Sequence, residues 1–136
     1  MIPKKLMEAY EAADYVVFEQ PELVLKIGEP SRRLDALLEH EGAETAVFVT
    51  AANPRSEKKS AAENAEALEA LDQLIRASGY PWRAGEGREP DGSWREASRL
   101  VMGIYRENAE ALGRLFGQNA IVFVEKGAAP ELLVLA

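Results

Sequence analysis

Hydrophobic side chains recur every three or four residues in several stretches of the chain, which is the spacing of an amphipathic helix that packs one face against a core. The predicted helices are residues 4–13, the segment from Ser31 to Gly42, the segment from Ser60 to Gly79, and residues 106–117. Ser31 and Ser60 are typical N-cap residues, and Gly42 and Gly79 are typical of the position after the last helical turn. The pattern therefore predicts about four helices.

Other runs are short and rich in leucine, β-branched and aromatic residues, which favours β-strands. The predicted strands are residues 15–18, 23–27, 45–50, 80–84, 98–104, 121–124 and 132–135. The first two runs are separated by Gln20-Pro21-Glu22, a spacing that favours an antiparallel hairpin. The run from Thr45 to Thr50 is almost continuously apolar, as expected of a strand that is buried on both faces. Residues 85–92 are rich in turn-forming residues and predict a loop.

These elements follow one another in the order α-β-β-α-β-α-β-β-α-β-β. Helices between successive strands favour crossovers between parallel strands, whereas short links between strands favour antiparallel neighbours. We therefore expect an α+β fold in which a single mixed β-sheet is packed with about four helices. A chain of 136 residues of which 47% are hydrophobic has enough material for a single domain over residues 1–136.

The charge balance limits the classes of partner. The chain has 16 Lys and Arg against 23 Asp and Glu, a formal net charge of -7, which is the wrong sign for binding a phosphate backbone. We expect no nucleic-acid partner. No segment approaches the roughly 18 consecutive apolar residues of a membrane span, and the first residues do not resemble a signal peptide. We therefore expect a cytoplasmic protein that does not enter a membrane.

The residue types that are missing exclude several chemistries. The chain has no cysteine, so thiolate nucleophiles, disulfides and cysteine-bound zinc are impossible. His40 is the single histidine and falls in the last turn of a predicted helix, where a structural role on the surface is favoured. No acidic loop of the calcium-binding type is present. We expect no metal site, and no cofactor is evident.

Three segments together resemble a known family. They are Thr50-Ala51-Ala52-Asn53-Pro54-Arg55-Ser56, then Gly85-Glu86-Gly87 with Trp94 and Glu96-Ala97-Ser98, and finally Leu115-Phe116-Gly117-Gln118-Asn119-Ala120. In this order they resemble the bacterial domain-of-unknown-function family numbered 3293. The resemblance implies a small stand-alone bacterial protein, and it brings no established activity, substrate or cofactor.

The loop after the predicted strand 45–50 is the first candidate site. Asn53, Arg55 and Ser56 lie there, followed by two lysines and the start of a helix, whose free N–H groups attract anions. Arg88, in the loop 85–92, could clamp the same anion. The alternative explanation is structural, because an Asn-Pro turn, a helix cap and solvated lysines are common without any ligand.

Two further segments carry candidate polar groups. Trp94, Glu96 and Ser98 alternate, so they would share one face of a strand that began early, and Glu96 could then act as a general acid or base. Gln118 and Asn119 follow a predicted helix, where their amides could bind a ligand. Each segment also has a structural alternative: Trp94 could cover the edge of the core, and Asn119 could end the helix in a left-handed conformation.

The sequence thus leaves three functions open and does not decide whether the protein is an enzyme. The favoured one is a binding module for a small anionic or phosphorylated molecule that contacts Asn53, Arg55, Arg88, Gln118 and Asn119. The second is a protein-interaction module or homodimer that pairs through an exposed edge strand at residues 132–135. The third is an acid-base enzyme that uses Glu96.

Overall fold

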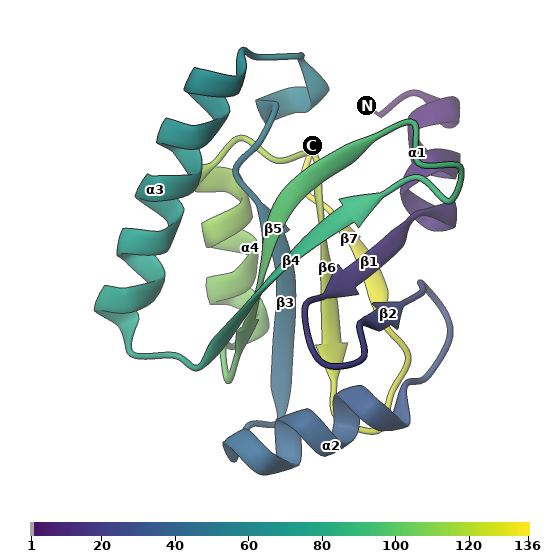
Figure 1. The fold of residues 1–136 in the computed structure, drawn as a ribbon, viewed down its shortest axis with the longest axis vertical. Coiled ribbons are helices and arrows are strands. Elements are labelled where there is room, and N and C mark those ends of the chain that lie inside the picture. The colour runs from purple at the N-terminus through teal and green to yellow at the C-terminus, as the bar shows by residue number, and fades with distance from the viewer. Residues whose placement is uncertain (1) are drawn as a thin grey trace.

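A computed structural model describes residues 2–136 and confirms the predicted α+β class and element order (Figure 1). The helices are α1 (Lys4–Ala12), α2 (Arg32–Glu41), α3 (Ala61–Ser78) and α4 (Arg106–Leu115), with a short 3-10 turn, η1, at Pro54–Ser56. The strands are β1 (Asp14–Val17), β2 (Leu23–Leu25), β3 (Thr45–Thr50), β4 (Trp82–Arg88), β5 (Arg95–Met102), β6 (Ala120–Glu125) and β7 (Glu131–Val134). Ser31 and Ser60 are the N-caps of α2 and α3, and Gly42 and Gly79 take left-handed conformations at their ends.

The strands form one seven-stranded sheet in the order β2-β1-β4-β5-β3-β6-β7. Every neighbouring pair is antiparallel, so the parallel neighbours expected of a mixed sheet do not form. The reason lies in the crossovers: α3 connects β3 to β4, and α4 connects β5 to β6, but each pair is separated in the sheet by an antiparallel strand. The predicted hairpin of the first two strands is confirmed by the pairing of Tyr15 with Leu25.

The prediction of a loop at residues 85–92 is wrong for its first half, because β4 continues to Arg88. Gly85 lies opposite Val17 of β1 and Ser98 of β5, so it has a neighbouring strand on each side. A Cβ atom at Gly85 would overlap the carbonyl oxygen of Val16, and this close approach explains why glycine occupies the strand. The chain turns only at residues 89–94, and β5 accordingly begins earlier than predicted, at Arg95.

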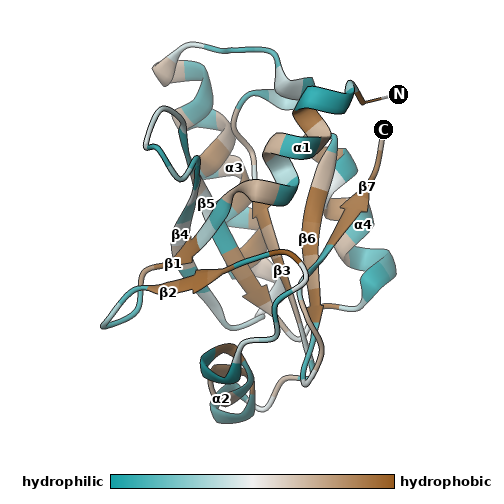
Figure 2. Cartoon of the chain, turned by 90° about the vertical axis from the view of Figure 1, so that its right-hand side faces the viewer, coloured by the Kyte–Doolittle hydropathy of each residue, from teal (hydrophilic) through white to brown (hydrophobic). Residues whose placement is uncertain are grey.

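The sheet is buried on both faces around β3, as predicted. Ala46 and Phe48 point into a core cluster shared with α2, whereas Val47 and Val49 point into a second cluster shared with α3. Helices α3 and α4 cover this second face (Figure 1), and the inner strands β3 and β6 are predominantly hydrophobic in Figure 2. The other face is concave.

The sheet curls until its two edges approach each other. The N–H of Gly28, after β2, donates a 2.9 Å hydrogen bond to the carbonyl of Pro130, which precedes β7. Helix α2 packs Leu34, Leu37 and Leu38 into one end of the concave face, while α1 lies over the other end without a fully buried residue (Figure 2). Among residues 2–136, no helix is both long enough and apolar enough to cross a membrane.

Candidate functional site

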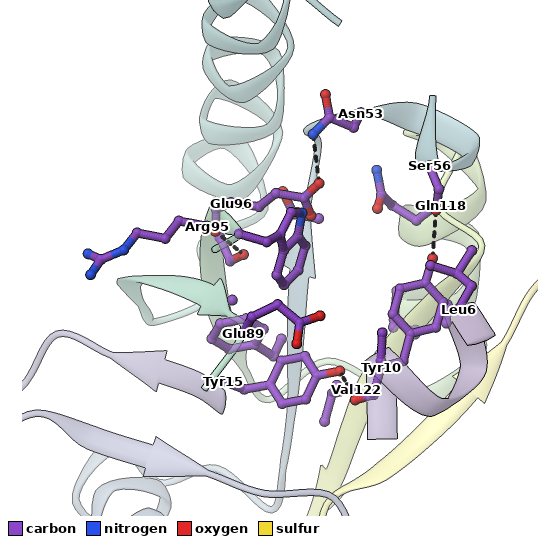
Figure 3. Close-up of a pocket in the computed structure, with 18 of the residues that line it drawn as sticks. Leu6, Tyr10, Tyr15, Asn53, Ser56, Glu89, Arg95, Glu96, Gln118 and Val122 are labelled. Atoms are coloured by element: carbon purple, nitrogen blue, oxygen red, sulfur yellow. Dashed lines mark hydrogen bonds between the residues drawn. The ribbon is translucent and has the colours of Figure 1, made fainter. Parts of the chain in front are cut away.

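A pocket of about 740 Å³ occupies the end of the concave face that α2 leaves uncovered (Figure 3). Its floor is made by inward-facing residues of the sheet, and its walls by α1, the β4–β5 hairpin and the loop between β3 and α3. The lining residues come from these four regions, from the start of α3 and from the segment between α4 and β6, and they include Leu6, Tyr10, Tyr15, Phe48, Thr50, Asn53, Ser56, Lys58, Lys59, Ala61, Asn64, Gly87, Glu89, Trp94, Arg95, Glu96, Ser98, Gln118, Ala120, Val122 and Leu132.

The pocket brings together most of the site residues that the sequence suggested. The predicted residues in its lining are Asn53, Ser56, Trp94, Glu96, Ser98 and Gln118. They come from three segments that are far apart in the chain but meet where β3 ends and where β5 and β6 begin. This convergence follows from topology, because β5, β3 and β6 are adjacent and β3 is antiparallel to both neighbours.

The remaining predicted residues do not line this pocket. Arg88 forms hydrogen bonds with Glu86, at 2.9 Å, and with Glu22, at 3.3 Å. Arg55 and Asn119 instead line a smaller hollow of about 500 Å³ near both ends of the described chain. The two guanidinium groups that were to hold an anion are therefore not part of the larger pocket.

Asn53 fixes the position of the Glu96 carboxylate. Its Nδ2 atom donates a 2.8 Å hydrogen bond to Glu96 Oε2, while its Oδ1 atom accepts hydrogen bonds from the backbone of Lys59, at 2.9 Å, and from Asn64 Nδ2, at 3.0 Å. The backbone N–H of Asn53 also donates to Asn64 Oδ1. This network ties the start of β5 to the loop that leads into α3.

Burial and hydrogen bonding have opposite effects on the pKa of Glu96. Partial burial in the pocket wall raises the pKa of Glu96 above its ordinary value of 4.5, and hydrogen bonds from Asn53 and Trp94 oppose the rise. Ser98, two residues on along β5, donates its hydroxyl proton to the carbonyl oxygen of Glu96 at 3.0 Å. Glu96 and Ser98 lie in β5 and Trp94 directly precedes it, and all three residues line the pocket.

The loop after β3 has an unusual backbone. Asn53, Arg55 and Ser56 have positive φ angles of 46°, 57° and 61°. Non-glycine residues in this region are uncommon and cost free energy, and such strain tends to gather at functional sites. A 2.7 Å hydrogen bond from the N–H of Arg55 to the carbonyl of Gly117 holds the loop against the segment that follows α4.

Gln118 has a structural role in addition to its place in the pocket wall. Its Nε2 atom donates to the carbonyl oxygens of Ala52 and Phe116, each at 3.2 Å, so the carboxamide satisfies a carbonyl near the end of α4. Asn119 does not take the left-handed conformation, which belongs instead to Gly117 with a φ of 66°. Asn119 donates from Nδ2 to Ser56 Oγ at 3.1 Å.

Several lining residues were missed by the sequence analysis. Tyr10 was assigned to a helix stripe and Tyr15 and Phe48 to strands, and all three lie against the pocket. The rings of Tyr15 and Phe48 pack edge to face, with centroids 5.4 Å apart, and the Tyr15 hydroxyl donates to the backbone carbonyl of Tyr10. Glu89 was assigned to a loop. No local signal could have identified these residues, because an aromatic residue in a strand looks the same whether it fills a core or lines a cavity.

The described part of the chain, residues 2–136, contains no group of three or more His, Asp or Glu side chains placed to hold a metal ion.

Comparison with known proteins identifies the family but not an activity. No curated protein and no solved structure matches the chain. A family model described as "Protein of unknown function (DUF3293)" matches residues 49–121, a range that contains the segments 50–56, 85–98 and 115–120. Because this match covers more than half of the chain, the protein belongs to the DUF3293 family.

Proposed function

We propose that the protein is a binding module for a small molecule and that the ligand occupies the pocket on the concave face of the sheet. One observation carries the proposal: Asn53, Glu96 and Gln118, which are distant in sequence, present their side chains to the same cavity of about 740 Å³. Independent caps and turns would not have to meet in this way, and a cavity of this size is within the usual range for small-molecule sites.

The loop conformation supports the same proposal. The positive φ angles of Asn53, Arg55 and Ser56 are maintained by hydrogen bonds to residues of other elements, among them Gly117 and Asn64. A protein that needed only a connection between β3 and α3 would have no reason to retain this strain.

An anionic or phosphorylated ligand, which the sequence favoured, would depend on Lys58 and Lys59 for its positive charges. Lys58 is an exposed residue of the pocket lining, and Lys59 Nζ lies 3.7 Å from a carboxylate oxygen of Glu57. Neither arginine of the original anion clamp lines the pocket. The arginine clamp therefore gives no support for a negatively charged ligand in this pocket.

The binding function can be tested with a pair of matched substitutions at the pocket mouth. Ala61 and Ala62 are neighbouring exposed residues at the start of α3, but only Ala61 lines the pocket. A library of small charged and neutral compounds would be screened by following the indole N–H of Trp94 and the side-chain amides of Asn53 and Gln118 by NMR. Hits should shift all three signals in the native protein and in Ala62→Trp, and they should lose affinity in Ala61→Trp. Hits that bind both variants equally, or no hits at all, would contradict the proposal.

Self-association through β7 is the second candidate function. Among residues 2–136, β7 pairs only with β6 and ends the sheet, and Val134 on this strand is 45% exposed. An edge strand presents unpaired backbone groups to which a second chain can add. Light scattering at high protein concentration would detect the dimer, and replacing Val134 with Lys should dissociate it; a monomer at every concentration would contradict this candidate.

Glu96 also meets the first requirement of an acid-base catalyst, because it lines a pocket and its pKa is raised by burial. This third candidate adds a reaction to the proposed binding site. If an activity is found, Glu96→Gln should abolish it, and unchanged turnover in that variant would exclude the role.

A further inference from the structure

Several hydroxyl, amide and indole donors of the pocket wall are used within the protein, so these groups offer a ligand mainly hydrogen-bond acceptors. The hydroxyl of Thr50 donates to the carbonyl of Ala97 at 2.7 Å, and that of Ser98 donates to the carbonyl of Glu96 at 3.0 Å. The Tyr15 hydroxyl donates to the carbonyl of Tyr10. These hydroxyls retain lone pairs but no free proton for a ligand.

The amide and indole donors are directed at protein acceptors in the same way. Gln118 Nε2 donates to two carbonyl oxygens, which leaves the Oε1 atom as its available group. Asn53 Nδ2 donates to Glu96, and a hydrogen bond from Trp94 reaches the same carboxylate. A ligand that fits these walls must therefore bring donors of its own.

Two carboxylates supply the negative charge of the pocket. Glu89 and Glu96 flank Trp94 in sequence, and both belong to the lining (Figure 3). Neither forms a salt bridge with any cation of residues 2–136. Arg95 lies between them in the chain, but it pairs with Glu86 at 3.1 Å and extends away from the pocket (Figure 3).

Aromatic side chains line the same pocket as these two carboxylates. Tyr15 lines the cavity together with Glu89 and Glu96, and its pKa is raised first by burial, then by Tyr10, and further by these two carboxylates. Tyr10, Trp94 and Phe48 line the same cavity. Aromatic faces attract organic cations and tolerate their apolar parts.

We propose that the ligand of this pocket is a small organic ammonium compound, whose charged N–H groups bind Glu96 and Glu89 and whose apolar part lies against Tyr10, Tyr15 and Trp94. This inference rests on the proposed binding function and specifies its ligand class. Lys58 and Lys59 also line the pocket, but Lys58 is exposed to solvent, which screens its charge, and Lys59 Nζ lies 3.7 Å from a carboxylate oxygen of Glu57. An ammonium group would supply both hydrogen-bond donors and a positive charge to these two carboxylates.

Three probes of similar shape test which ligand charge the pocket prefers: 2-phenylethylamine is positive, 2-phenylethanol is neutral and 3-phenylpropionate is negative. Each would be titrated into the protein at pH 7 while the Trp94 indole signal is followed by NMR. We expect the amine to bind about tenfold more tightly than the alcohol, because it adds an ion pair and a cation–π contact. The propionate should bind more weakly than the alcohol.

Substitutions assign the selectivity to the two carboxylates. Glu96→Gln and Glu89→Gln preserve the side-chain shape, and each should reduce the affinity for the amine severalfold while leaving that for the alcohol unchanged. Glu44→Gln is the control for net charge, because Glu44 is exposed and pairs with Lys126 outside the pocket. It should leave all three affinities unchanged.

The outcomes distinguish this inference from the proposed function. If the propionate or the alcohol binds more tightly than the amine, and Ala61→Trp weakens that binding, the pocket is a small-molecule site and the ammonium assignment is wrong. Amine binding that is insensitive to both Glu96→Gln and Glu89→Gln also contradicts the assignment. If none of the probes shifts the pocket signals at millimolar concentration, the ammonium assignment fails, and the proposed binding function is then decided by the library screen with Ala61→Trp and Ala62→Trp.

Discussion

Asn53 and Glu96 are joined by a 2.8 Å hydrogen bond across 43 residues of sequence. The bond connects the strained loop after β3 with the first residues of β5, and it holds a carboxylate in the wall of a cavity. Asn53 is suited to this role because asparagine tolerates a positive φ angle better than most residues and has both a donor and an acceptor on its side chain. In this pair, a residue with a strained backbone holds a charged group of the pocket through a side-chain hydrogen bond.

Replacing Asn53 with alanine should destabilise the protein and alter the titration of Glu96. The variant loses the hydrogen bonds to Glu96, Lys59 and Asn64, so we expect a loss of about 1–3 kcal/mol in the free energy of unfolding. The pKa of Glu96 should rise further, because a hydrogen bond that favours its charged form is removed. Urea unfolding and an NMR titration of the carboxyl carbon measure the two effects. Asn119→Ala, which loses one bond to Ser56, should leave the Glu96 pKa unchanged.

The raised pKa of Glu96 predicts the direction of a pH effect on stability. Between the ordinary value of 4.5 and the higher folded-state pKa, the folded protein binds this proton more than the unfolded chain does. The contribution of Glu96 to the free energy of unfolding is therefore present at low pH and is lost as the pH rises through this interval. Glu96→Gln should accordingly gain stability relative to the native protein between pH 4 and pH 7.

Glu63 provides a control of opposite sign for that experiment. Hydrogen bonds from Ser60 lower the pKa of Glu63 in the capping box at the start of α3. Its contribution is therefore present at neutral pH and is lost as the pH falls, so Glu63→Gln should become relatively more stable towards acid. Denaturant unfolding of the three proteins from pH 3 to pH 8 would show the two trends. Parallel stability curves for Glu96→Gln and the native protein would contradict the assigned shift.

Gly85 and Gly87 should respond differently to alanine although both lie in β4. The Cβ atom of Gly85→Ala would overlap the backbone oxygen of Val16, so β1 and β4 would have to separate. We expect a loss of about 2 kcal/mol or more, because the clashing atom belongs to the backbone and cannot rotate away. In Gly87→Ala the new atom would lie 3.4 Å from the Trp94 ring, which is an ordinary contact, so stability should change little. Thermal unfolding compares the two variants, and equal destabilisation would contradict the prediction.

Removing either partner of the buried ion pair between Arg99 and Asp72 should destabilise the protein strongly. Arg99 Nε donates to Asp72 Oδ1 at 2.7 Å, and Asp72 is only 7% exposed, so Arg99→Met would leave a buried carboxylate without its partner. We expect a loss of about 3 kcal/mol. The exposed pair of Arg76 and Glu69, at 3.8 Å on the same helix, is the matched comparison, and Glu69→Gln should cost less than about 0.5 kcal/mol. Similar losses for the two variants, measured by urea unfolding, would contradict this difference.

The helices and most strands were predictable because their signals are local. Ser31 and Gly42 delimit α2 as expected, since a cap acts through backbone groups within one helical turn. The continuous apolar run of β3 indicated burial on both faces, and Ala46 and Val47 do point into different core clusters. The family, too, was recognisable from short segments of the sequence, and the match over residues 49–121 confirms it.

The candidate site was predictable only in part. Asn53, Glu96 and Gln118 were singled out as polar residues near the ends of elements, and the fold brings them to one cavity. Arg88 was assigned to a loop, but β4 extends to it and it pairs with Glu22 and Glu86 instead. The error arose because Gly85 and Gly87 resemble a turn in sequence, whereas Gly85 allows the close approach of the neighbouring strand.

The sequence by itself determined which segments form helices and strands, because periodicity, caps and β-propensity depend on neighbours along the chain. Tertiary structure alone decided the order of the strands, the antiparallel pairing throughout and the curl that turns one face of the sheet into a pocket. Those features depend on which distant strands pair most favourably, a competition that no local pattern encodes. For the same reason Tyr15 and Glu89 became pocket residues only once β1, the β4–β5 hairpin and α1 had been brought around the concave face.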